Sequence, residues 1–292
     1  MRLSRSVIST MLLCMVLAVV LAACAPKQMT YAYTTDTAWE NINTENSGFA
    51  NYNDFISEVD ECFEQIGTFI YGDDWHDIFR ERYGDEKVFF YFDKTISRAV
   101  SNKHVVLNQF FFENRIAPIA HEIAHIVLTS KNDTLREGFA SFCQDEFGKN
   151  HAISNFGLDV HALARYYLTP AHAKIIENIG HCEWPEFGQV SMGDFRPAVY
   201  RTSHSFVNYL IETYGTDKFL ELYKTIKTDA DYAAVYGKEI AEIKADWLTF
   251  LQEYERPLTK DEIHNQLKQV FSHANMSEEE ATRLAEAYML ID

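Results

Sequence analysis

The sequence predicts an α+β protein dominated by helices, and two observations carry this prediction. Two short runs rich in aromatic and β-branched residues, 88–92 and 104–107, predict strands of a small sheet. From Arg115 onward, apolar residues recur almost throughout at helical spacing. A small N-terminal sheet followed by a helical C-terminal body is typical of the α+β class.

The elements follow in chain order. Apolar residues at helical spacing predict helices over 53–69 and 73–83, and the two strands are separated by a polar connection, 93–103. The helical body is expected over 115–129, 134–147, 159–168, 170–179, 197–214, 216–227 and 238–254. Pro257 then breaks the chain, and shorter amphipathic helices follow near 259–272 and 277–290. Ser277 and Glu280 form a capping box at the start of the last helix.

The N-terminus has the layout of a secretory signal peptide. Arg2 and Arg5 precede an uncharged apolar stretch, 6–23, and small residues follow. The stretch is also long enough to be interpreted as a short, uncleaved membrane anchor. Leu21-Ala22-Ala23-Cys24 resembles the bacterial lipobox and favours cleavage after residue 23 and acylation of Cys24. We therefore expect a lipoprotein held at a membrane outside the cytoplasm, with residues 24–50, polar and without periodicity, as a tether.

Net charge limits the possible partners, and cysteine content limits the possible disulfides. The chain has 292 residues and a formal net charge of −17, so its surface repels phosphate and nucleic acid is not expected as a partner. Outside residues 1–24, three cysteines remain: Cys62, Cys143 and Cys182. They allow at most one disulfide, and buried free thiols are an equal alternative.

His121-Glu122-Ile123-Ala124-His125 carries the chemistry. Residues four apart share a helix face, so both imidazoles can reach one ion, with Glu122 beside them. Imidazole suits Zn²⁺, which lowers the pKa of water toward neutrality. Two core histidines satisfied by hydrogen bonds are the alternative, but burying these groups without a purpose costs several kcal/mol.

Catalytic zinc takes three protein ligands, and Glu137 is the candidate for the third. Eleven residues separate it from His125, and a short link places its helix next to the first. The competing interpretation is that Thr134 and Glu137 form a capping box. Gly138 favours the ligand role, because a glycine there lets another backbone approach closely. We expect one Zn²⁺ per chain.

HEIAH followed by the Glu137-Gly138-Phe139-Ala140 helix resembles the gluzincin metallopeptidases, most closely the peptidase MA-like group. The resemblance covers roughly residues 100–250. It implies a zincin-like metallopeptidase domain, taken as 51–255, with 256–292 as a helical extension. Arg136 stands where aminopeptidase-type members often have Asn, and Ser141 stands where thermolysin-like members have a carboxylate. The aminopeptidase signature is missing, because Glu113 lies too close to His121.

The resemblance also implies roles for single residues. Glu122 takes a proton from the attacking water and returns it to the leaving amine. Tyr200 and His204, four apart on one helix, are candidates for stabilising the oxyanion, against ordinary core packing for each. The strand at 105–107 is expected as the edge that pairs with an extended substrate. Phe110-Phe111-Phe112 could line a pocket or pack in the core, and the other histidines are expected to be structural or solvated.

The sequence therefore predicts a lipid-anchored zinc metallopeptidase that acts on a peptide or protein substrate in the bacterial cell envelope. The alternative is a binding or assembly lipoprotein that keeps the fold without turnover. The intact Glu122 counts against that alternative.

Overall fold

The computed structural model describes residues 29–152, 155–192, 195–256 and 258–272, with single residues 277, 279, 282 and 283. The predicted signal peptide, the lipidation of Cys24 and most of the last predicted helix lie outside these residues. One compact unit begins at Tyr31. None of the helices in the described ranges is long and apolar enough to cross a membrane.

The sheet has four strands in the order β1 (Ala32–Tyr33), β2 (Val88–Asp93), β4 (His104–Asn108) and β3 (Arg98–Ser101). β1 and β4 run parallel to β2, whereas β3 is antiparallel to β4. Two predictions are corrected here. The connection 93–103 contains β3, and the strand at 105–107 lies inside the sheet, because β3 covers its outer side. The short, largely exposed β3 has no alternation of polar and apolar residues that would reveal it.

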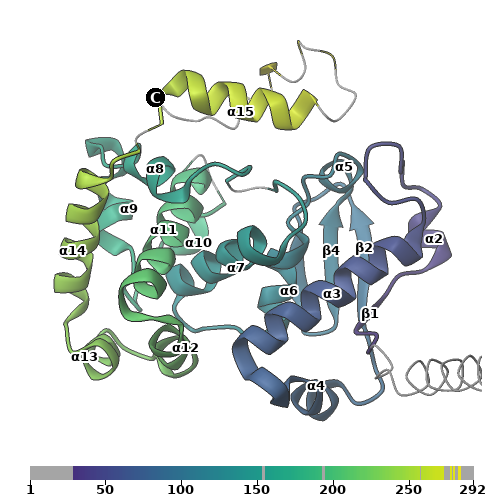
Figure 1. Cartoon of the computed structure of the whole chain (residues 1–292), viewed down its shortest axis with the longest axis horizontal. Helices are drawn as coiled ribbons and strands as arrows, with labels where there is room; N and C mark the ends of the chain where they lie inside the picture. The colour runs from purple at the N-terminus through teal and green to yellow at the C-terminus, as the bar shows by residue number, and fades with distance from the viewer. Residues whose placement is uncertain are drawn as a thin grey trace, which may run out of the picture. The chain divides into compact units, whose positions relative to one another are not determined.

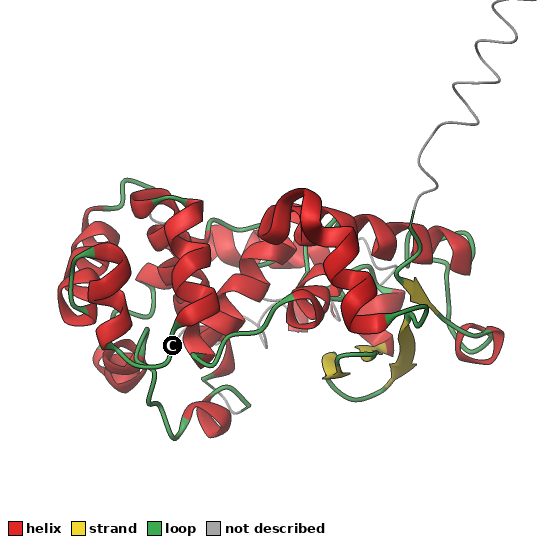
Figure 2. Cartoon of the chain, turned by 90° about the horizontal axis from the view of Figure 1, so that it is seen from below, coloured by secondary structure: helices red, strands yellow, loops and turns green. Residues whose placement is uncertain are grey.

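Helices make up the rest, as the sequence predicts for an α+β protein (Figure 2). They are α2 (Asp36–Trp39), α3 (Tyr52–Tyr71), α4 (Trp75–Tyr83), α5 (Gln109–Glu113), α6 (Ile119–Val127), α7 (Asp133–Phe147), α8 (Val160–Arg165), α9 (Ala173–Asn178), α10 (Phe187–Val190), α11 (Arg196–Tyr214), α12 (Thr216–Thr225), α13 (Ala230–Tyr236), α14 (Ile240–Glu253) and α15 (Lys260–Ser272), with 3-10 turns at Gly72–Asp74 and Pro170–His172.

The predicted tether is wrong for residues 31–50, which belong to the fold. Tyr31 and Ala32 are buried, and both backbone N–H groups donate to Asp60 Oδ1, at 2.7 and 3.0 Å. Phe49 stacks on Phe112 inside an aromatic cluster. Strand pairing with distant residues and aromatic side chains that stand singly in the sequence order this segment, although it lacks local periodicity.

Helix packing positions the site. In Figure 1, α3 lies across the strands, and α6 and α7 lie between the sheet and the helices α8–α14. A Cβ added to Gly138 on α7 would lie 2.4 Å from the backbone oxygen of Ser203 on α11. The close approach expected at Gly138 is therefore present, and it joins α7 to α11.

The C-terminal extension contributes α15, which packs onto the body. Its apolar side chains form one cluster with residues before α6 and around α8: Ile116, Phe156, Leu163, Ile263, Leu267, Val270 and Phe271. Cys62, Cys143 and Cys182 are free, and burial raises the pKa of Cys62 to about 12. Of the two interpretations of these cysteines, free thiols are the one found.

Candidate metal centre

Helix α6 presents the two histidines. It begins at Ile119 rather than Arg115, because Pro118 disfavours helical backbone at the residue before it. Every residue of α6 except His125 is buried. Gln144 of α7 accepts hydrogen bonds from the backbone N–H groups of Ala120 and His121, at 2.9 and 3.3 Å. This contact satisfies two free donors at the start of α6 and fixes α6 against α7.

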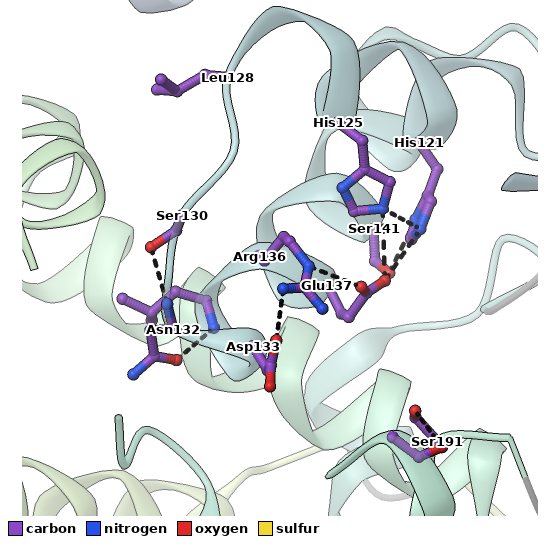
Figure 3. Close-up of polar contacts among 12 residues, drawn as sticks. His121, His125, Leu128, Ser130, Asn132, Asp133, Arg136, Glu137, Ser141 and Ser191 are labelled. Carbon is purple, nitrogen blue, oxygen red and sulfur yellow. Dashed lines mark hydrogen bonds and ion pairs between the residues drawn. The ribbon is translucent and has the colours of Figure 1, made fainter. Parts of the chain in front are cut away.

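Glu137 lies on α7 and faces both histidines (Figure 3). The capping-box interpretation is wrong, because α7 begins at Asp133 and its N-cap is Asn132, whose side chain accepts from Leu135 N. The Thr134 hydroxyl instead accepts from the backbone N–H of Gly180 at 3.2 Å. The Glu137 carboxylate is therefore available to the two imidazoles.

Three ligand atoms form a compact triangle. His121 Nε2 lies 3.2 Å from His125 Nε2, and Glu137 Oε2 lies 3.4 and 3.5 Å from these nitrogens. Tetrahedral zinc with bonds of about 2.0–2.1 Å separates its ligand atoms by roughly 3.3–3.4 Å. The residues therefore fit one face of a zinc tetrahedron and leave the fourth position to a non-protein ligand. Among the residues described, no other His, Cys, Asp and Glu side chains form such a group.

Neighbouring side chains orient the ligands. Ser141 Oγ lies 3.4 Å from His121 Nδ1, so Ser141 can orient the His121 ring. Arg136 donates from Nε to Glu137 Oε1 at 3.2 Å and forms an ion pair with Asp133. Arg136 thereby occupies one carboxylate oxygen and leaves Oε2 to face the imidazoles.

The pKa shifts of Glu137 and His125 have opposite directions. Burial acts to raise the pKa of Glu137, but the charge and hydrogen bonds of the two histidines outweigh it and hold this pKa well below its usual range. Burial acts to lower the pKa of His125, but the Glu137 charge and hydrogen bond outweigh it and raise this pKa. The buried Glu137 carboxylate is thus stabilised by neighbouring positive charge, which a bound cation would supply with both imidazoles neutral.

Glu122 lines the same cavity as the triangle. This cavity has a volume of about 1440 Å³ and also borders β3, α10 and the start of α11. Burial raises the pKa of Glu122, while the neighbouring histidines and the backbone amide of Ala99 on β3 oppose this rise. A carboxylate whose pKa lies above its usual range is a stronger base than an exposed one, as a proton acceptor requires.

The structure separates Tyr200 from His204. The Tyr200 ring stacks on the His121 ring, with centroids 5.9 Å apart, and it lines the cavity. Burial, followed by the Glu137 charge, raises the pKa of its hydroxyl, which therefore stays protonated.

His204 is 1% exposed and does not line the cavity. Its Nδ1 accepts from Asn155 Nδ2 at 2.8 Å, so the buried ring is neutral. The catalytic assignment of His204 is corrected to a core position, because its turn of α11 faces α7 and α8 instead of the metal centre.

The remaining phenylalanines and histidines named in the sequence analysis also separate into cavity, core and exposed positions. Phe112 packs in the core, Phe111 borders the cavity, and Phe110 is 41% exposed. His161 contacts Ser205, and His181 contacts Asp229. Sequence reasoning missed Gln144 and the cavity residue Arg196, because no motif marks either position.

Compared with models of known protein families, with curated proteins and with solved structures, the chain has no match. The residues of the site are therefore the basis for assigning a function.

Proposed function

We propose that this protein is a lipid-anchored, extracytoplasmic zinc metallopeptidase with a zincin-like catalytic domain. The observation that carries the proposal is the triangle of His121, His125 and Glu137 in one cavity with Glu122. Three ligands with an open fourth position are typical of catalytic zinc, whereas structural zinc is closed by four protein ligands.

When bound, Zn²⁺ supplies Lewis-acid chemistry that polarises a carbonyl and acidifies water. Glu122 is the general base: its carboxylate accepts a proton from the attacking water and delivers it to the leaving amine. The burial that raises its pKa also excludes competing water from the carboxylate. Ser141 and Arg136 act as positioning residues for His121 and Glu137.

Tyr200 is the proposed donor to the oxyanion. Its protonated hydroxyl lies near Glu137, and its ring packs on His121. A donor fixed by packing stabilises developing charge without reorganisation.

Strand β3 is the proposed platform for the substrate backbone. Arg98, Ala99 and Ser101 of β3 line the cavity, and α6 packs against this strand. One side of β3 pairs with β4, so its other side is open to an extended peptide as an added strand.

The proposal is tested with the full chain by measuring bound zinc and the cleavage of a mixed peptide library. We expect about one zinc per chain and turnover that falls at least about 100-fold in Glu122→Gln, with zinc retained. Glu137→Ala should lose most of the zinc, because one of three ligands is removed. Glu146→Gln, at an exposed position on α7, is the matched control and should behave as the wild type.

Two results would contradict the proposal. Stoichiometric zinc in Glu137→Ala would remove Glu137 from the ligand set. A wild-type chain that cleaves no peptide, while binding a partner equally well with Gln at 122, would support the non-catalytic binding lipoprotein instead.

The anchor is tested separately. Cys24→Ala should abolish acylation and release the protein from membranes, because Leu21-Ala22-Ala23-Cys24 supplies the proposed lipid attachment. Fractionation and the mass of the mature chain measure both effects. Cys14→Ala, within the apolar stretch, is the control. Full membrane partitioning of Cys24→Ala would favour an uncleaved membrane anchor.

A further inference from the structure

The cavity at the metal centre has a charge opposite to that of the whole chain. The chain carries a formal net charge of −17. The basic residues that line the cavity are Arg82, Lys94, Arg98, Arg136, Arg196 and Arg201, whereas its acidic residues are Glu122, Asp133 and Glu137. A positive cavity within an acidic protein concentrates anions locally.

Several of these cations already have structural roles. Arg82 donates to the Val127 carbonyl at 2.5 Å and to the Tyr71 hydroxyl at 2.7 Å. Arg136 is paired with Asp133 and Glu137. Arg201 is buried and donates to the Tyr167 hydroxyl at 2.6 Å. These three contribute positive charge to the cavity, but their hydrogen bonds are directed to the protein.

Arg196 differs from them. It is the first residue of α11, it is half-buried, and its guanidinium carbon lies 5.3 Å from the centroid of the Tyr200 ring. In the described part of the chain, no carboxylate forms an ion pair with it. Stacking on an aromatic face fixes a guanidinium and leaves its N–H donors at the ring's edge available for a planar anion.

The distance from Arg196 to the metal centre suits a peptide. The Tyr200 ring that carries the guanidinium stacks at 5.9 Å on His121, so one aromatic ring separates Arg196 from a ligand histidine. An extended chain advances about 3.3–3.6 Å per residue, so two or three residues span the path from the Arg196 guanidinium across the Tyr200 ring to His121.

We infer that the substrate of this site is a peptide with a carboxylate two or three residues from the bond that is cleaved, and that Arg196 binds this carboxylate. The inference rests on the proposed peptidase function. An Asp or Glu side chain and the C-terminal carboxylate present the same chemistry to a guanidinium, as two oxygens in one plane. Arg98, whose hydrogen bonds go to neutral oxygens of Thr95 and Ile96, adds positive charge on the β3 side.

The test measures equilibrium binding with the full, detergent-solubilised chain carrying Glu122→Gln, so that no peptide is consumed. One peptide of fixed length is compared with variants that carry Glu or Gln at each position. Each variant is made with a free and with an amidated C-terminus. We expect carboxylate peptides to bind at least about tenfold more tightly than their neutral partners, with less preference at high salt. The position of the effective carboxylate distinguishes a side chain from the C-terminus.

Adding Arg196→Gln should reduce the ratio of the two affinities toward one, and Arg196→Lys should restore part of it. Arg80→Gln, an exposed change of the same charge on α4, should leave the ratio unchanged. The inference is overturned if the wild-type site shows no carboxylate preference, or if Arg80→Gln lowers the ratio as much as Arg196→Gln does.

The same peptides, offered to the chain with native Glu122, separate the two proposals. Absence of cleavage with an intact Arg196-dependent preference would overturn the peptidase function and support carboxylate recognition. Cleavage without that preference would support the peptidase function and overturn carboxylate recognition by Arg196.

Discussion

His121 and His204 are both buried, yet their neighbours give them different roles. His121 Nε2 faces the Glu137 carboxylate at 3.4 Å inside the cavity. His204 is surrounded by Asn155 at 2.8 Å, Asp145 at 3.9 Å and the charges of other histidines. Burial, followed by the charges of His161 and His121, lowers the pKa of His204 to about 3. Because the folded ring stays neutral, protonation of the unfolded ring at low pH favours unfolding.

The lowered pKa of His204 makes the stability of the fold depend on pH. An unfolded histidine takes up its proton near pH 6.5, whereas folded His204 does so near 3. Between these values the unfolded state binds more protons, so the free energy of unfolding falls as pH falls. Asp60 and Asp145, whose pKa values burial raises to about 6, act in the opposite direction. We therefore expect His204→Gln to lose less stability than the wild type between about pH 6.5 and 4.

Urea unfolding at several pH values measures this difference, with exposed His151→Gln as the control. His204→Gln should also retain zinc and turnover, because the ring lies outside the cavity. A 100-fold loss of turnover in a variant with wild-type stability and zinc would return His204 to the catalytic residues.

At the scale of elements, the α7–α11 contact sets the geometry of the site. Glu137 is on α7 and Tyr200 on α11, and Gly138 lets the two helices approach. Alanine favours helix over glycine by about 1 kcal/mol, so only the packing at this position opposes a substitution. The atom that a methyl group would meet at 2.4 Å is the Ser203 backbone oxygen, which cannot move without moving α11.

Gly138→Ala should therefore lower the free energy of unfolding by about 1–3 kcal/mol. It should also weaken zinc binding, because α7 carries the proposed ligand Glu137. Denaturant unfolding and zinc titration measure both. Gly188→Ala, where an added Cβ meets nothing within 4 Å, should leave stability equal or higher. If Gly138→Ala were as stable as Gly188→Ala, the close approach would not restrict the site.

The elements that the sequence predicts best are those with a long local pattern. The predicted helices 53–69 and 197–214 correspond to Tyr52–Tyr71 and Arg196–Tyr214. The spacing within His121–His125 likewise predicts that both histidines share one helix face. Glu137, on the next helix, faces them as expected. Residues 31–50 were missed because their order depends on partners distant in the chain, such as Val88 for Ala32. β3 was missed because its four residues show no alternation of polar and apolar side chains. His204 was misplaced for a related reason, since spacing along a helix does not show what packs against each turn.

Across the whole molecule, helix α15 is connected to the candidate metal centre through packing. Ile116 precedes α6 by only a short link and belongs to the same apolar cluster as Leu267 and Phe271 of α15. Gln266 also donates to the Phe156 carbonyl at 3.1 Å. Helix α15 thus covers the segment that leads into the histidine helix.

Leu267→Ala should therefore destabilise the protein by about 2–5 kcal/mol, because Leu267 is fully buried and its truncation leaves a cavity between α15 and the body. Because Ile116 shares that cavity, amide hydrogen exchange should rise around Ile116 and Leu163 as well as in α15. Gln269→Ala, exposed on the same helix, changes helix composition without opening a cavity and is the matched control. Unfolding free energies and exchange rates measured on the two variants decide the matter. If Leu267→Ala and Gln269→Ala were equally stable, α15 would not be part of the cooperative core, and the site would not depend on this helix.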